Sequence, residues 1–204
     1  YFLHEHYFYK NGEQKYTWSF EDEEIHFSVG SHGIYQVENI SIMLMVLKLL
    51  ANDGIDINWN DINSLIESTE LVGRFEKIVE KPLIILDSAH NVRGIEMFIQ
   101  SVERSYHDKK KHLLFAGFKD KALDEMLQRL TSHFDSISVT TFQHERAATL
   151  NDMQELAEKH HFQVVEDWKE KIISILNDRS RTDVYFVTGS LHFIAQVRTF
   201  ILTQ

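Results

Sequence analysis

Apolar and polar residues follow two different patterns along the chain, and the pattern changes near residue 73. Before that point, runs with the two-residue period of strands come first, and runs with a helical period follow. We predict strands at 7–9, 15–20 and 24–29, and helices at 36–50 and from about Asn60 to Ser68. Asn11-Gly12, between the first two strands, indicates a β-hairpin turn. The helix at 36–50 is almost wholly apolar, so we expect it to be buried on most sides.

After Gly73 the pattern alternates between short apolar runs and longer amphipathic runs. Predicted strands lie at 75–79, 83–86, 112–117, 136–140 and 183–187, with a weaker one near 163–165, and predicted helices at 92–105, 121–131, 150–159, 167–177 and 191–202. This alternation predicts an α/β fold with a mostly parallel, Rossmann-like sheet flanked by helices. Right-handed crossovers place the loops after the strands on one edge of the sheet, where ligands gather. We expect a domain boundary near residues 70–73.

Composition narrows the possible partners. The 204 residues carry a formal net charge of −10, and the densest positive cluster is only Lys109–Lys111, so we expect no nucleic-acid partner. The most apolar segment, Ile40–Leu50, is too short to span a bilayer and contains Lys48, so we expect no membrane partner. The absence of cysteine excludes disulfides and thiolate metal sites and fits a cytoplasmic protein. Because strand-like sequence begins directly at Tyr1, we expect a piece of a longer protein.

The apolar run Leu83–Leu86 ends in four polar residues, namely Asp87, Ser88, His90 and Asn91. A carboxylate just past a buried strand can accept hydrogen bonds from ribose hydroxyls, and Asn91 can contact a base edge or cap the next helix. In the alternative interpretation, Asp87 or Ser88 merely caps that helix. The strand tip therefore predicts either a nucleotide contact or a helix start.

Three other positions are weaker candidates when each is taken alone. Arg74 follows a glycine and precedes a strand, where its guanidinium can reach a phosphate, although a single arginine is more often a surface residue. Asn39 lies near a helix start and can simply satisfy a backbone group. Thr188-Gly189-Ser190 joins an apolar strand to the last helix, which suits either an anion or a tight turn with a serine cap.

Several nucleotide and metal signatures are absent from the sequence. No Gly-x-x-x-x-Gly-Lys-Ser/Thr phosphate loop and no Gly-x-Gly-x-x-Gly fingerprint occurs. His4-Glu5-His6 and His160-His161 lack the helical spacing of a zinc site, so we expect no metal ligated by this chain.

Six segments in the same order resemble one family. They are Gln36-x-x-Asn39, Gly73-Arg74-Phe75-Glu76, Leu86-Asp87-Ser88-Ala89-His90-Asn91, Gly117-Phe118-Lys119-Asp120-Lys121, Arg146-Ala147 and Thr188-Gly189-Ser190-Leu191-His192-Phe193. Together they resemble folylpolyglutamate synthase and dihydrofolate synthase, which are ATP-dependent amide ligases of the Mur ligase superfamily. The resemblance covers roughly residues 30–204. Two positions depart from it, since Ile40 and Ala122 replace a small residue and an aspartate that are usual in the family.

The resemblance implies how the chain is divided. Residues 1–72 would be the carboxyl-terminal remnant of the central ATPase domain, ending in its β-hairpin and helices. Residues 73–204 would be the carboxyl-terminal domain, the glutamate ligase domain. The phosphate loop and the magnesium ligands of the family would lie upstream, so we expect this chain to be inactive alone.

The resemblance also implies roles for individual residues. The ATP contacts would be Asn39, Arg74, Asp87 and Asn91. His90 would be the catalytic residue that lines the nucleotide cleft, and Ser190 would bind substrate on the glutamate or folate side.

The implied reaction is ATP-dependent addition of L-glutamate to folate, with dihydropteroate as a further acceptor. ATP and Mg²⁺ would be required, and an acyl phosphate would be the intermediate. We expect a cytoplasmic monomer. Two alternatives stay open: a Mur-type ligase that acts on a peptidoglycan precursor, and a non-catalytic module that binds a nucleotide or a partner.

Overall fold

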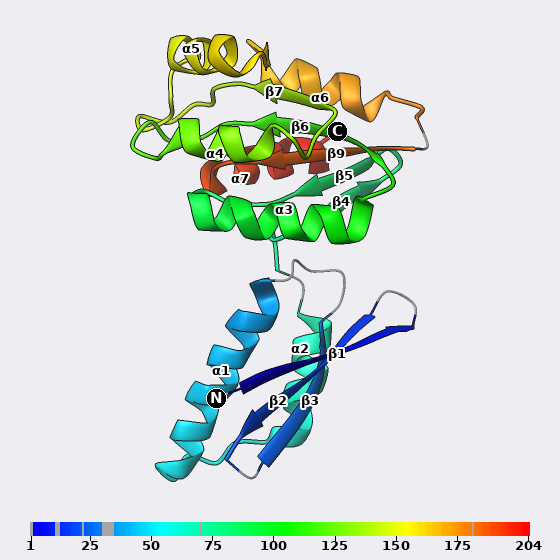
Figure 1. The fold of residues 1–204 in the computed structure, drawn as a ribbon, viewed down its shortest axis with the longest axis vertical. Helices are drawn as coiled ribbons and strands as arrows, with labels where there is room; N and C mark the ends of the chain where they lie inside the picture. The colour runs from blue at the N-terminus through cyan, green and yellow to red at the C-terminus, as the bar shows by residue number, and fades with distance from the viewer. Residues whose placement is uncertain (1, 11–12, 22, 30–34, 70, 181) are drawn as a thin grey trace. The chain divides into compact units, whose positions relative to one another are not determined.

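The computed structural model describes residues 2–10, 13–21, 23–29, 35–69, 71–180 and 182–204. The chain divides into two compact units, Tyr1–Leu71 and Val72–Gln204 (Figure 1). The predicted Asn11-Gly12 turn lies outside the described residues. The assignment of the first unit to an ATPase domain stays a prediction.

The first unit pairs an antiparallel sheet with two helices. The strands β1 (Phe2–Lys10), β2 (Glu13–Phe20) and β3 (Glu23–Val29) follow one another in the sheet, and the helices are α1 (Tyr35–Asn52) and α2 (Trp59–Ser68). Alternate residues of β2 and β3 bury aromatic and apolar side chains against both helices, as strand periodicity requires. This core consists of Tyr16, Trp18, Phe27, Val29, Val37, Leu44, Ile62 and Ile66.

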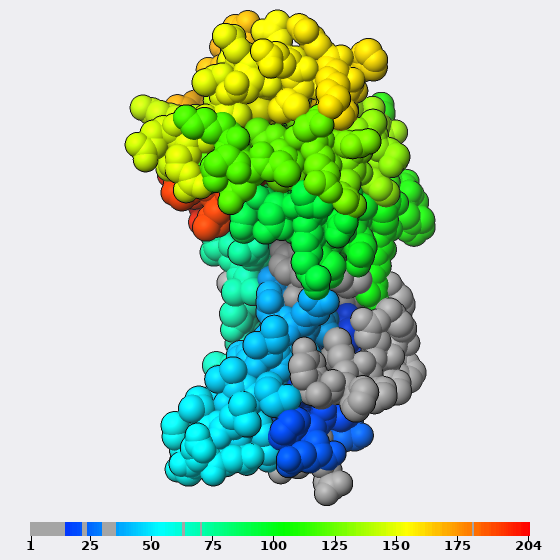
Figure 2. Space-filling view, turned by 60° about the vertical axis from the view of Figure 1, so that its left-hand side comes forward, coloured from blue at the N-terminus to red at the C-terminus, as the bar shows by residue number. Residues whose placement is uncertain are grey.

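One prediction for the helices of this unit is wrong, and the other is confirmed except at its first residue. The helix α1 is not buried on most sides, because Ile42, Val46 and Leu49 each expose at least half of their surface. Figure 2 shows α1 at the surface of its unit. The helix α2 begins before Asn60, with Asn58 as its N-cap, and the Asn58 side chain donates to Asp61 Oδ2 (2.6 Å) instead of bonding the helix backbone.

The second unit contains a six-stranded sheet in the order β4-β5-β9-β6-β7-β8. The strands are β4 (Glu76–Glu80), β5 (Leu83–Leu86), β6 (Lys110–Phe115), β7 (Ser136–Val139), β8 (Gln163–Val164) and β9 (Asp183–Thr188). Only β4 and β5 pair in antiparallel fashion, and the other neighbours are parallel. The predicted α/β class with a mostly parallel sheet is therefore confirmed.

Helices cover both faces of this sheet. They are α3 (Val92–Tyr106), α4 (Leu123–Leu130), α5 (Leu150–His160), α6 (Trp168–Leu176) and α7 (Leu191–Leu202). On one face Phe115 and Phe186 pack with residues of α3, α4 and α5, and on the other Leu114 and Val187 pack with residues of α6 and α7 (Figure 1). Burial on both faces explains why these strands are continuous apolar runs in the sequence.

The carboxyl ends of the parallel strands lie at one edge, and the backbone there is closely packed. Hydrogen bonds continue the ladder past the strand ends, from Asp87 N–H to Val187 O (3.0 Å) and from Ala116 N–H to Thr188 O (3.2 Å). At Gly189 φ is +120°, and a Cβ would lie 2.3 Å from Ala116 O, so only glycine fits. This edge collects the loops that carry most of the predicted site residues.

Candidate functional site

Asp87 holds the strand tip together instead of capping a helix. Its carboxylate is 1 % exposed and accepts from two backbone groups, Phe75 N–H at Oδ2 and Ala89 N–H at Oδ1, both at 2.9 Å. The capping interpretation of Asp87 and Ser88 is therefore wrong, and the cap of α3 is Asn91, whose Oδ1 accepts from Gly94 N–H at 2.8 Å. Asp87 ties the segment before β4 to the end of β5.

Arg74 extends from a backbone that is fixed on both sides. Its neighbours Gly73 and Phe75 have φ values of +67° and +52°, which lie in the left-handed region. The Gly73 carbonyl accepts from Ser88 N–H at 2.9 Å, and the Phe75 side chain is 2 % exposed in the core. No residue in the described part of the chain pairs with the Arg74 guanidinium. An unpaired guanidinium on a rigid backbone suits a carboxylate or phosphate.

The Ser88 carbonyl fixes the tautomer of the neutral His90 ring. Its Nδ1 lies 2.9 Å from the Ser88 carbonyl oxygen, which can only accept, so Nδ1 carries the hydrogen. In the neutral ring Nε2 is then an acceptor, and within the described residues it has no hydrogen-bond partner. His90 can therefore accept a proton or a hydrogen bond from a ligand.

Ser190 precedes α7 but does not cap it with its side chain. The hydroxyls of Ser88, Thr188 and Ser190 are buried, and none has a hydrogen-bond partner among the residues that the structure describes. Buried hydroxyls normally find a partner, so three unpaired ones on adjacent loops are unusual. Ser190 occupies the N-cap position of α7, as the serine-cap interpretation predicts, but its side chain makes no cap hydrogen bond.

The loops after β6 and β7 meet in a group of rings and charges. Lys119 N–H donates to Arg146 O at 2.9 Å, and the Arg146 guanidinium contacts both Asp120 oxygens while it lies 4.6 Å from the Phe118 ring centre. The Arg146 hydrogen bond lowers the pKa of the Asp120 carboxyl. The structure therefore joins the 117–121 and 146–147 segments.

Two histidines complete this group of rings. The His144 and His192 ring centres lie 4.7 Å apart, and each ring also contacts Phe118. The sequence analysis assigned no role to His144 or His192, because the two residues lie 48 positions apart and no local pattern relates them.

Asn39 lies in the other unit. It is exposed on α1, and its Nδ2 lies 3.4 Å from Gln36 Oε1. Both amides line a mostly apolar cavity of about 290 Å³. Arg74, Asp87, His90 and Asn91 thus lie together in the second unit, with Ser190 on the loop that follows the neighbouring strand β9.

The structure offers no metal site within its described residues, where no group of three or more His, Cys, Asp or Glu side chains converges. His160 instead pairs with Asp124, with Nε2 and Oδ1 2.8 Å apart. The side chains of His4, Glu5 and His6 lie outside the described residues. No helix in the described ranges has the length and apolarity needed to cross a bilayer.

Comparison with known proteins decides the family. Residues 73–191, more than half of the chain, match the family "Mur ligase, glutamate ligase domain". The chain belongs to this family. Its relatives include the dihydrofolate synthase/folylpolyglutamate synthase of Bacillus subtilis, 26 % identical over 167 residues, which covers 81 % of this chain and 39 % of the relative. The folylpolyglutamate synthase of Lacticaseibacillus casei is 27 % identical over 195 residues, covering 93 % of this chain and 44 % of the relative.

Solved structures agree with this family assignment. The folylpolyglutamate synthase of Thermotoga maritima matches with a TM-score of 0.73 at 27 % identity, covering 94 % of this chain and 44 % of that chain. Escherichia coli FolC in complex with ADP matches with a TM-score of 0.67 at 25 % identity, and the match covers 77 % of this chain and 38 % of that chain. The chain therefore spans less than half the length of these relatives.

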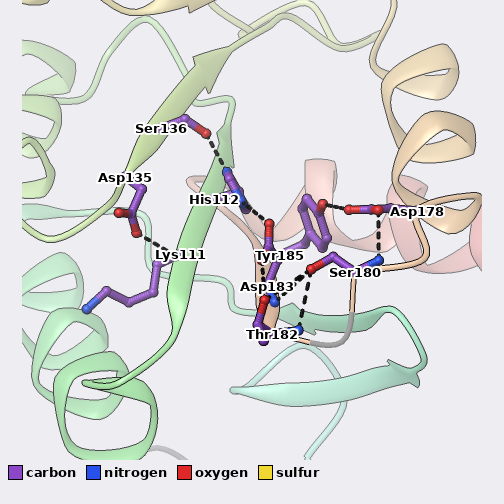
Figure 3. A network of polar contacts seen from close by, with 9 residues as sticks. All are labelled: Lys111, His112, Asp135, Ser136, Asp178, Ser180, Thr182, Asp183 and Tyr185. Atoms are coloured by element: carbon purple, nitrogen blue, oxygen red, sulfur yellow. Dashed lines mark hydrogen bonds and ion pairs between the residues drawn. The ribbon is translucent and has the colours of Figure 1, made fainter.

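The opposite edge of this glutamate ligase domain carries a different set of polar side chains (Figure 3). We call His112, Ser136, Asp178, Asp183 and Tyr185 the amino-edge network. His112 bridges two strands, with Nε2 2.9 Å from Asp183 Oδ2 and Nδ1 2.7 Å from Ser136 Oγ, and the Tyr185 hydroxyl donates to Asp178. Because each member already has a partner, this network is a poor ligand site, and the carboxyl edge remains the candidate.

Proposed function

We propose that the protein containing this chain joins L-glutamate to a folate carboxylate with cleavage of ATP. The relatives are named dihydrofolate synthase and folylpolyglutamate synthase. Solved relatives are described in complex with ADP, with DHPP and ADP, or with Mn, AMPPNP and L-glutamate. The observation that carries the proposal for this chain is the unpaired Arg74 guanidinium on a rigid backbone beside Asp87 and His90.

The reaction proceeds in two steps. A carboxylate oxygen of the folate attacks the γ-phosphorus of ATP, which forms an acyl phosphate and releases ADP. The glutamate amine then attacks the acyl carbon, loses a proton, and the tetrahedral intermediate expels inorganic phosphate. Charge accumulates on phosphoryl oxygens in the first step and on the acyl oxygen in the second, so fixed cationic and donor groups lower both barriers.

The chain supplies part of this machinery. Arg74 binds a phosphate oxygen, because its neighbours fix its position and no carboxylate among the described residues pairs with it. Asp87, whose carboxylate lies at the tip of β5, accepts from a ribose hydroxyl. Asn91 addresses the nucleotide through its amide. In the first unit, Asn39 stays a proposed nucleotide contact, because the cavity that it lines suits the flat, apolar face of a base.

The two remaining site residues, His90 and Ser190, act on the glutamate amine and the substrate. With Nδ1 occupied by the Ser88 carbonyl, His90 uses Nε2 to accept the proton that the glutamate amine loses. We assign Ser190 to substrate binding, because its hydroxyl has no hydrogen-bond partner among the described residues. Magnesium neutralises phosphate charge when bound, and we place its ligands and the phosphate loop in the part of the relatives that this chain does not span, so the chain alone is inactive.

The test is phosphate release by the full-length protein with ATP, L-glutamate and either tetrahydrofolate or dihydropteroate. We expect release that depends on both the acceptor and glutamate, and release with one or both acceptors defines the preference. Release only with a peptidoglycan precursor and its amino acid would assign the alternative ligase. Nucleotide binding without release for any acceptor would assign a binding module.

A further inference from the structure

The backbone that presents Arg74 is supported by a helix far away in the sequence. Residues Ile194 and Arg198 lie one turn apart on α7, so they share a face of that helix. A Cβ placed on Gly73 would lie 3.1 Å from Ile194 Cγ2, which shows how closely α7 approaches this turn. Arg198 contacts Glu76 from the same face, across 122 positions of sequence.

Glu76 connects this helix to the turn. Its Oε2 accepts from Gly73 N–H at 2.7 Å, and Arg198 Nε lies 2.9 Å from Oε1 and 3.2 Å from Oε2. The Glu76 side chain is 19 % exposed and that of Arg198 is 32 % exposed. A carboxylate that binds a guanidinium and a backbone N–H together has little freedom to move, and partial burial limits screening by water.

The turn is therefore fixed at both ends. Glu76 holds Gly73 before Arg74, and Asp87 holds the N–H of Phe75 after it. Both flanking residues have positive φ, a conformation that the rest of the structure must maintain, above all at Phe75, which is not glycine. Releasing one end allows this backbone to relax and moves the Arg74 side chain.

We propose that Glu76 and Arg198 are positioning residues for Arg74, and that their ion pair sets the affinity of this site for the phosphates of a nucleotide. The proposal rests on the proposed function. It assigns a role in phosphate binding to two residues that contact no reacting group.

The first experiment measures ADP affinity by calorimetry, together with the KM for ATP and kcat, in the full-length protein. Arg198→Met removes the ion pair but keeps most of the apolar stem, and we expect about tenfold weaker nucleotide binding with a smaller change in kcat. Arg198→Lys keeps the positive charge but lacks the planar fork of the guanidinium, so its ADP affinity should lie between those of the wild type and Arg198→Met. Arg129→Met is the matched control, because it breaks the Arg129 pairs with Glu96 and Glu125 elsewhere in the unit and should leave binding unchanged.

A double-mutant cycle separates positioning from a general loss of stability. If Arg198 acts through Arg74, adding Arg198→Met to Arg74→Ala should weaken ADP binding no further. Additive losses, or unchanged binding in Arg198→Met, would overturn the proposal. Glu76→Gln provides a second, isosteric variant of the same contact and should reproduce the loss if Arg198→Met folds poorly.

Hydrogen exchange tests the contact without any nucleotide. The amides of Gly73 and Phe75 should exchange faster in Arg198→Met than in the wild type, whereas the control should match the wild type. If the wild type binds ADP, Arg74→Ala loses this affinity and Arg198→Met keeps it, only the positioning role is contradicted. A wild-type protein with no affinity for ADP contradicts the proposed function, and the positioning role with it.

Discussion

In the six-stranded sheet, the polar side chains at the amino ends of the parallel strands (the amino edge) differ in their hydrogen bonding from those at the carboxyl ends (the carboxyl edge). Members of the amino-edge network are bonded to one another, and hydrogen bonds from Ser180 and His112 lower the pKa of the Asp183 carboxyl to about 2. At the carboxyl edge, the Arg74 guanidinium and three buried hydroxyls have no partner in the described part of the chain. Paired groups stabilise a fold, while unpaired ones at the ends of parallel strands are available to a ligand.

This difference separates residues that serve stability from residues that serve binding. A change at the amino edge should lower the free energy of unfolding and leave nucleotide affinity intact. A change in the side chain of Arg74 should lower nucleotide affinity and leave the free energy of unfolding almost unchanged. Asp87 belongs to both classes, because it bonds two backbone groups inside the site.

The largest effect is expected for Arg74→Ala in the full-length protein. Removing the phosphate-binding guanidinium should reduce kcat/KM for ATP by roughly 10²- to 10³-fold. The unfolding free energy should change by less than about 0.5 kcal/mol, because the Arg74 guanidinium has no hydrogen bond or ion pair among the described residues. Steady-state kinetics and urea unfolding measure the two quantities, and a large loss of stability with normal kinetics would place Arg74 in the structural class.

Asp87→Asn should cost about 2–4 kcal/mol of unfolding free energy. The amide can accept only one of the two backbone N–H bonds, and its own NH₂ then faces the other buried donor. Asp108→Asn, at an exposed position, is the control in urea unfolding. If both variants unfold at the same urea concentration, Asp87 does not hold the strand tip.

Asp183→Asn should cost about 1–2 kcal/mol near neutral pH and leave nucleotide affinity unchanged. The folded pKa of about 2 lies below the ordinary 3.8, so this stabilisation is complete above about pH 4 and disappears as the pH falls through 2. The stability difference between wild type and variant should therefore shrink between pH 4 and pH 2, as followed by thermal unfolding. A constant difference over that range would refute the assignment of the low pKa to Asp183.

The smallest effect is expected for the exposed Asp120–Arg146 pair. Asp120→Asn should leave thermal unfolding close to that of the wild type, because both side chains are about half exposed and water screens their attraction. The midpoint of thermal unfolding measures this. A clear drop in that midpoint would show that the Asp120–Arg146 pair stabilises the domain.

Much of the second unit could be predicted from sequence, for identifiable reasons. Strands such as Leu83–Leu86 are buried on both faces and therefore appear as apolar runs, and the helices between them are amphipathic. The amphipathic helix α2 was also placed nearly correctly. The exposed side of α1 was not, because an apolar sequence cannot reveal what a helix packs against.

The site was predictable only in part. Arg74, Asp87 and His90 lie within one short stretch, so a local pattern could single them out. The contact between Glu76 and Arg198 spans 122 positions, and the bonds of His112 join three strands, so no local pattern reports either. Ser190 occupies the N-cap position that the sequence suggested, but a sequence pattern cannot report that its buried hydroxyl has no partner among the described residues.

The central claim is that the carboxyl edge, through Arg74, binds the phosphates of a nucleotide. Calorimetric titration of ADP into the full-length wild type, Arg74→Ala and His112→Ala tests it most directly. We predict that Arg74→Ala loses at least about tenfold in affinity, whereas His112→Ala binds like the wild type despite its lower stability. Equal affinity in wild type and Arg74→Ala, or a selective loss in His112→Ala, would contradict the account.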